Sequence, residues 1–175
     1  MGKVIIPKTY IEKLDAPLIF LLGPITSAPN WQDKAIEILF SQNSDLLIVS
    51  PRRGVRDKIA QYILTGDENH FCRQRVWEWH YQGIAAKQGC NMFWFPEEYE
   101  HHCDKSYALI TSNEFGHWTA EYSRDKSVRV CFGTDGRFRE WGAFETDLRI
   151  KCPDKKIFST LEKTCAEAAR IACKK

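Results

Sequence analysis

Continuous apolar runs alternate with amphipathic segments along most of the chain. Each run is short and is closed by glycine, proline or polar residues, which is typical of a strand buried on both faces of a parallel sheet. The runs that predict strands lie at residues 17–25, 45–51, 90–96, 128–133 and 155–160. Apolar positions at helical spacing predict helices over residues 30–40, 71–89, 112–125, 138–150 and 160–175.

This alternation defines the expected fold class. It favours a single α/β domain over residues 1–175, built on a doubly wound, five-stranded, mainly parallel sheet with helices on both faces, as in flavodoxin-like and Rossmann-like proteins. In such sheets, ligands bind at the carboxyl ends of the strands, where successive connections diverge. We therefore expect the functional residues directly after the strands.

Several helix ends carry local signals. Asn30 is a suitable N-cap for the first predicted helix, and Gly89 is a natural residue to follow the end of the second. The third helix is expected to begin near Ser112 or Asn113. Residues 52–70 are polar and mixed, and they predict a long excursion with a few helical turns, of the kind that often forms a binding or lid element.

Composition and charge narrow the function classes. Hydrophobic residues make up 43% of the chain, charged residues 27%, and the net charge is +2, which is too small to predict binding to a nucleic-acid polymer or a membrane surface. No apolar run approaches the roughly 20 residues that span a bilayer. The first residues hold too short an apolar stretch for a signal peptide. We therefore expect a cytoplasmic protein without membrane contact.

The cysteines argue against a redox or metal function. The chain has seven cysteines and no CxxC pair, which is typical of reduced thiols. The triplet at 101–103, "HHC", could suggest a metal site together with Cys90 or His117, but its spacing matches no zinc pattern and a solvated loop is the simpler interpretation. We expect neither a metal nor a cofactor.

The first predicted strand ends in "GPITSAPNW". Gly23, Pro24 and Ile25 can turn backbone amides toward a ligand, because glycine places no side chain in the way. The segment lacks the GxGxxG and Walker spacings, so a dinucleotide or a triphosphate loop is not expected. Trp31 could stack on an aromatic base, although packing of the helix on the sheet is the alternative.

Two further positions combine polar chemistry with a suitable place. Gln74 and Glu78 are four residues apart on a predicted helix and share one face, where they could bond a heterocycle or a sugar hydroxyl, or simply face solvent. Glu114 follows the third of the predicted strands, in "ALITSNEFGHW". A carboxylate at a helix start is stabilised by the helix dipole, which would also keep it ionised as a nucleophile requires.

An ordered set of motifs resembles the nucleoside 2-deoxyribosyltransferase-like family. The set consists of "IFLLGPI" followed by a tryptophan, a proline after the second strand, "QRVWE" on a helix, "FWFP", "ALITSNEFG" and "VRVCFG". The resemblance extends from about Pro17 to the C-terminal helix, and the lead-in "VIIPKTYIEKLDAP" also looks like that family.

The resemblance implies a chemistry and a set of residue roles. Its members transfer 2-deoxyribose between nucleobases, and Glu114 matches the glutamate that attacks the anomeric carbon to give a covalent glycosyl-enzyme. Asn113 and Gly116, from the same "NEFG" step, are candidate substrate contacts. Asp104 is the candidate second catalytic group; Asp104 and Ser112 are nearby substitutes for the family's acid, and neither matches its position. The implied partners are a nucleoside or nucleotide, a free base, and further copies of the chain in a homo-oligomer.

Alternatives remain because the chain departs from the family pattern. Many members have an aspartate about six residues before the nucleophile, where this chain has Ala108. An N-glycoside hydrolase acting on nucleosides or nucleotides is therefore one alternative, and a catalytically silent nucleotide-sensing module is another. A 5′-phosphate could be bound by Thr26 and Ser27, together with the arginines at 52, 53 and 56.

Overall fold

The computed structural model describes residues 2–52 and 70–174 as one parallel sheet with helices on both faces. The sheet has the order β1-β3-β2-β4-β5-β6, and every pairing between neighbouring strands is parallel. The strands are β1 (Lys3–Ile5), β2 (Leu18–Leu22), β3 (Leu47–Val49), β4 (Cys90–Phe95), β5 (Val130–Thr134) and β6 (Ile157–Phe158). The helices are α1 (Trp31–Gln42), α2 (His70–Gln88), α3 (Leu109–Arg124), α4 (Trp141–Lys151) and α5 (Leu161–Ala172).

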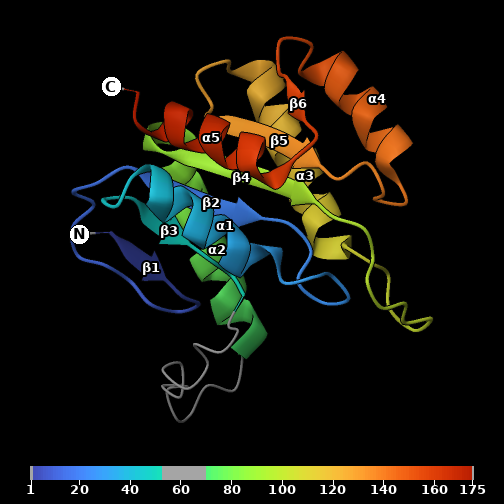
Figure 1. The fold of residues 1–175 in the computed structure, drawn as a ribbon, viewed down its shortest axis with the longest axis horizontal. Helices are drawn as coiled ribbons and strands as arrows, with labels where there is room; N and C mark the ends of the chain where they lie inside the picture. Colours follow the sequence, from blue (N-terminus) through green and yellow to red (C-terminus); the bar gives the residue numbers. More distant parts are fainter. Residues whose placement is uncertain (1, 53–69, 175) are drawn as a thin grey trace.

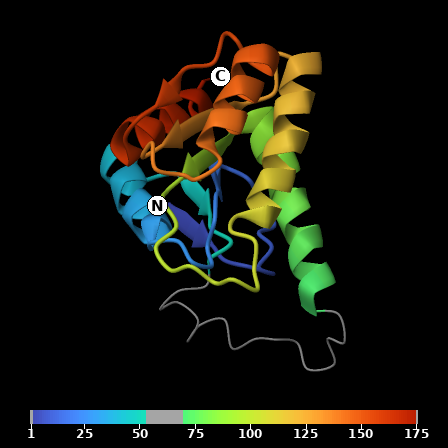
Figure 2. The same cartoon turned by 90° about the vertical axis from the view of Figure 1, so that its right-hand side faces the viewer.

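Helices α1 and α5 cover one face of the sheet, and α2, α3 and α4 cover the other (Figures 1 and 2). Strand β2 lies near the centre and is buried along its whole length. Its side chains alternate between two cores: Phe20 and Leu22 pack toward α2 and α3, whereas Ile19 and Leu21 pack toward α1 and α5. The doubly wound α/β fold is therefore confirmed.

The strand count differs from the prediction by one. The five predicted strands are present, and β1 adds a sixth at the sheet edge, beside β3. It has three residues, of which only Ile5 is buried. A strand of three residues is too short to show a periodic pattern in the sequence. Its pairing with β3, and not its own residue pattern, defines it as a strand.

The helix starts confirm one prediction and correct another. The side chain of Asn30 accepts a hydrogen bond from the backbone N–H of Asp33, as expected of an N-cap. Helix α3, however, begins at Leu109 and not near Ser112 or Asn113. The hydroxyl of Ser112 donates to the carbonyl of Ala108 within the first turn (2.9 Å), so this polar residue lies inside the helix and does not cap it.

Gly89 is required by close packing and not by a left-handed turn. It follows the last residue of α2, and a Cβ at this position would lie 2.0 Å from the carbonyl oxygen of Leu18 at the start of β2. We expect Gly89→Ala to lower the free energy of unfolding by about 1–3 kcal/mol, because the backbones of α2 and β2 must move apart.

Gly83 is the matched control on the same helix, since a Cβ there meets nothing within 4 Å. Gly83→Ala should raise the free energy of unfolding by about 0.5–1 kcal/mol, because alanine restricts the unfolded chain more than glycine does. Urea denaturation of both variants measures the two effects. Equal effects of the same sign would contradict this assignment.

The strand order places a switch point at β2. The chain passes from β2 to β3 on one side and later to β4 on the other side of β2. The connections that leave β2 and β4 therefore diverge to opposite faces of the sheet, which opens a crevice at the carboxyl ends of these strands.

Candidate active site

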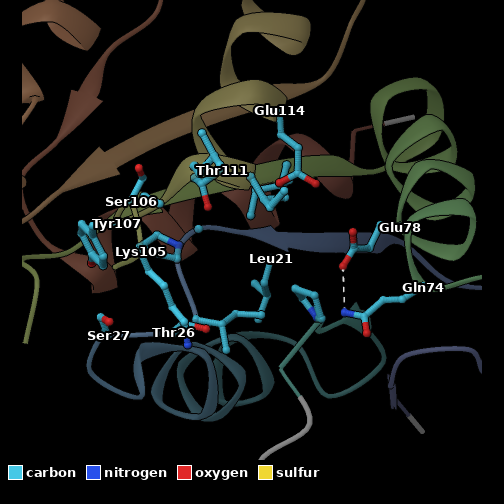
Figure 3. A pocket seen from close by; sticks show the side chains of 18 of the residues that line it. Leu21, Thr26, Ser27, Gln74, Glu78, Lys105, Ser106, Tyr107, Thr111 and Glu114 are labelled. Carbon is cyan, nitrogen blue, oxygen red and sulfur yellow. Dashed lines mark hydrogen bonds between the residues drawn. The ribbon is translucent and has the colours of Figure 1, made fainter. Parts of the chain in front are cut away.

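A pocket of about 590 Å³ lies at this switch point. Its walls are the end of β2 with the loop that follows it, Pro51 after β3, one face of α2, and residues 104–111 with Glu114 at the start of α3 (Figure 3). A nucleoside-sized ligand can be accommodated in a cavity of this size. A pocket therefore lies at the carboxyl ends of the strands, where the sequence predicted the functional site.

Glu114 lies in the second turn of α3 and reaches the pocket from its helix (Figure 3). Its side chain is only 7% exposed. The carboxylate oxygen Oε1 accepts hydrogen bonds from Nη1 of Arg75 (2.7 Å) and from Nε2 of Gln82 (2.8 Å). Among the described residues no donor bonds Oε2, and the residue lines the pocket. One oxygen is therefore anchored, while the other is available to a ligand.

Arg75, like Gln82, is a residue that the sequence interpretation missed. Its Nη1 bonds both Glu114 and Glu78, and its guanidinium lies 5.2 Å from the ring centroid of Trp79. Because both carboxylates bond the same nitrogen, their bonded oxygens lie within about 5–6 Å of each other. The i,i+3 spacing of Arg75 and Glu78 on one helix was the signal that could have identified it.

The electrostatics of Glu114 differ from those expected. Burial raises the pKa of Glu114 above its ordinary value, and the hydrogen bonds from Arg75 and Gln82 only partly counteract this effect. The start of α3 lies more than one turn away, so the helix dipole does not control this carboxylate. Arg75 and Gln82 supply the stabilisation that the helix start was expected to supply.

Arg75 remains charged between its two acidic partners. Burial alone would lower the pKa of Arg75, but its hydrogen bonds to Glu114 and Glu78, and their charges, raise it overall. Two carboxylates and one guanidinium form this cluster, so its formal charge is negative when both acids are ionised. Such a cluster favours a ligand, or a transition state, that carries positive charge.

Other predicted residues also line the pocket. Gly23, Pro24 and Ile25 form part of its wall. Gln74 and Glu78 lie side by side on α2, where Nε2 of Gln74 donates to Oε1 of Glu78 (3.0 Å). These residues are therefore brought together with Glu114.

Trp31 does not line this pocket. It is buried against the opposite face of the sheet, and its indole N–H donates to the carbonyl of Pro24 (2.9 Å). The nearby Gln32 donates to the same carbonyl (3.2 Å). The stacking prediction for Trp31 is wrong, because α1 covers the face away from the pocket. Trp31 instead holds the loop after β2 through its hydrogen bond to Pro24, from the side opposite the pocket.

The residues around Glu114 differ in their placement. Asp104 lines the pocket from the loop before α3 and is exposed. Asn113 is exposed and Gly116 is partly exposed, and neither lines the pocket, because helical periodicity turns them away from the face that holds Thr111 and Glu114. A Cβ at Gly116 would meet nothing within 4 Å, so no contact requires a glycine there.

One end of the pocket carries hydroxyl groups and a lysine. Thr26, Ser27, Lys105 and Ser106 lie away from the Gln74–Glu78 pair in the view of Figure 3. Arg52, proposed as a phosphate ligand, does not line the pocket and donates instead to the carbonyl of Ile25 (3.3 Å). The other two arginines of that group, at 53 and 56, lie outside the described residues, as does most of the predicted excursion over 52–70.

The fold is a flavodoxin-like α/β fold, and a pocket lies at its switch point. No protein-family model and no curated protein sequence matches the chain. Within the described ranges, no helix has both the length and the apolarity to cross a membrane. In the same ranges, no three His, Cys, Asp or Glu side chains gather as metal ligands.

Proposed function

We propose that the protein transfers 2-deoxyribose between nucleobases, with Glu114 as the nucleophile. The observation that carries this proposal is the asymmetry of the Glu114 carboxylate at the pocket wall: Oε1 is fixed by Arg75 and Gln82, and none of the described residues donates a hydrogen bond to Oε2. A nucleophile needs a defined direction of attack and an available lone pair, and this arrangement supplies both.

The proposed reaction has two displacements. Oε2 of Glu114 bonds to C1′ of the nucleoside while the bond from C1′ to the base nitrogen breaks, and its electron pair leaves with the base, which takes a proton. A second base then attacks C1′ through a nitrogen lone pair, loses a proton, and releases the carboxylate. Two displacements at one carbon give net retention. Asp104, on the pocket wall, is the candidate source of the proton.

The charge of the cluster supports this chemistry. The transition state of such a displacement has oxocarbenium character, with positive charge spread over C1′ and the ring oxygen. Glu78 and Glu114 place two carboxylates beside a single guanidinium, so the described part of the site is complementary to a cation. The absence of a 2′-hydroxyl in the sugar makes the cation easier to form.

A homo-oligomer in the cytoplasm belongs to the same proposal. Leu109 and Ile110 lie at the pocket wall and are 64% and 44% exposed. Exposed apolar side chains beside a pocket are typical of surfaces that another chain covers. Sedimentation analysis of the purified protein measures its oligomeric state.

The test is a base-exchange assay. The protein is incubated with a 2′-deoxynucleoside and a different free base, and the products are separated by chromatography. A new deoxynucleoside supports the transferase, whereas free base and free sugar without exchange indicate an N-glycoside hydrolase. Binding without turnover indicates a sensing module. Intact-mass analysis after rapid quenching should also detect one deoxyribosyl group on wild-type protein and none on Glu114→Gln.

The pH dependence follows from the raised pKa of Glu114. The nucleophile must be ionised, so activity should fall as the pH drops through this pKa. Because burial raises that pKa, the acid limb of kcat/KM should have its midpoint above 4.5, the ordinary value for glutamate. Rates measured from about pH 4 to about pH 9 locate the limb. A midpoint below 4.5 would contradict an assignment of the limb to Glu114.

A further inference from the structure

Gln82 links Glu114 to a second buried side chain. It lies on α2, is fully buried, and donates from Nε2 to Oε1 of Glu114 (2.8 Å). Its own Oε1 accepts from the indole N–H of Trp118 on α3 (2.7 Å). The backbone carbonyl of Gln82 accepts from Nδ2 of Asn91 on β4 (3.1 Å). The residue is therefore held at both its backbone and its side chain.

The indole fixes which way the amide of Gln82 faces. A tryptophan N–H can only donate, so it must meet the amide oxygen of Gln82 and leaves the amide nitrogen for Glu114. An amide nitrogen can donate to a carboxylate but cannot accept a proton from a carboxylic acid. The orientation of Gln82 therefore favours the ionised form of Glu114 over its protonated form.

We propose that Gln82, oriented by Trp118, is a positioning residue that holds Oε1 of Glu114 so that the ionised Oε2 faces the substrate. This inference rests on the proposed function for its catalytic consequence. The coupling between Gln82 and Glu114 is a physical claim that can be tested without turnover.

Among the described residues, the other charged groups at the pocket of Glu114 come from two elements. Helix α2 contributes Arg75 and Glu78, and the loop before α3 contributes Asp104 and Lys105 across the pocket. The segment of β2 that lines the pocket, residues 20–22, is apolar. Gln82 is a neutral donor in this set, so its loss changes the hydrogen bonding of Glu114 without changing the charge of the site.

The first experiment compares Gln82→Met with the wild-type protein. The glutamate side-chain carboxyl carbons are labelled with ¹³C, the signal of Glu114 is assigned with Glu114→Gln, and its pKa is measured by NMR titration. We expect a higher pKa for Glu114 in Gln82→Met, because a donor to the carboxylate is lost. At neutral pH, kcat should fall on the order of 10-fold with KM nearly unchanged.

Gln88→Met is the control, since it makes the same change at an exposed position on the same helix. It should leave both the Glu114 pKa and kcat at their wild-type values. An unchanged Glu114 pKa in folded Gln82→Met would overturn the proposal, and so would a rise in KM at constant kcat. The second result would place Gln82 in substrate binding and not in positioning.

Trp118→Phe tests the orienting step and replaces the first variant if Gln82→Met does not fold. Without the indole N–H, the amide of Gln82 can rotate and offer its oxygen to a protonated Glu114. The pKa of Glu114 should rise, by less than in Gln82→Met. A wild-type value would overturn the role of Trp118. If wild-type protein shows no exchange or cleavage, the proposed function fails while the titration still decides the coupling.

Discussion

Replacing Glu114 by glutamine is expected to reduce kcat by about 10³-fold or more while the protein stays folded. The amide has nearly the same size, and its oxygen can still accept from Arg75 and Gln82, so the contacts of Oε1 are kept. What is lost is the anionic oxygen that attacks C1′, and no covalent intermediate can form. The base-exchange assay measures the rate.

The same substitution should make the protein more stable at neutral pH, by about 0.5–2 kcal/mol. Burial raises the pKa of Glu114, which means that the folded protein favours the neutral acid more than the unfolded chain does. The stability linked to this group is therefore fully present below the unfolded pKa and is lost as the pH rises through the folded pKa. Glutamine is neutral at every pH and avoids this loss.

Thermal unfolding at several pH values tests the effect. The Tm of Glu114→Gln should exceed the wild-type Tm at neutral pH, and the difference should shrink as the pH falls and Glu114 becomes protonated. Arg75 is not left without a partner in the variant, because it still bonds Glu78. A large drop in Tm together with normal turnover would return Glu114 to a scaffold role.

Glu121→Gln is the matched control for both measurements. It makes the same change on α3, at a side chain that is 40% exposed and pairs with Arg124 at the surface. Exposed ion pairs contribute about 0–1 kcal/mol, and this carboxylate lies away from the pocket. Turnover should be unchanged and the Tm nearly so.

The fold was largely predictable because its central strands are buried on both faces. Residues 18–22 are apolar throughout, and residues 90–95 are apolar except for Asn91, a pattern typical of strands buried on both faces. Edge strand β1 was missed because pairing with β3, and not its own pattern, defines it. The start of α3 was misplaced because Ala108, a residue with no side-chain cap, takes a left-handed conformation with φ 57°.

The site was predictable only in part. Residues directly after the strands, such as Gly23 and Pro24, do line the pocket, because strand ends converge in any parallel sheet. Trp31 follows the same strand, but it packs against the face of the sheet that lies away from the pocket. Which face a helix covers depends on the topology of the whole fold, so the local sequence does not show it. Arg75 and Gln82 were missed because their roles depend on contact between α2 and α3.

Replacing Arg75 by methionine is expected to have the largest effect on stability, about 3–5 kcal/mol at neutral pH. The guanidinium is the one described cation that bonds both Glu78 and Glu114, whose side chains are 9% and 7% exposed. Without it, none of the described cations bonds either buried carboxylate, and Glu114 favours its protonated form more strongly. The acid limb of kcat/KM should therefore move to higher pH, and kcat at neutral pH should fall.

Two comparisons separate the charge of Arg75 from its packing. Arg75→Lys keeps a cation but replaces the planar guanidinium, whose Nη1 bonds both carboxylates, by a compact ammonium group, so its stability and its acid limb should lie between those of wild type and Arg75→Met. Arg124→Met removes an exposed arginine from α3 and should cost less than about 1 kcal/mol. Because protonation relieves the repulsion, the stability deficit of Arg75→Met should narrow as the pH falls. A deficit that is constant with pH would assign the loss to the contact of Arg75 with Trp79, since that contact does not depend on the carboxylates.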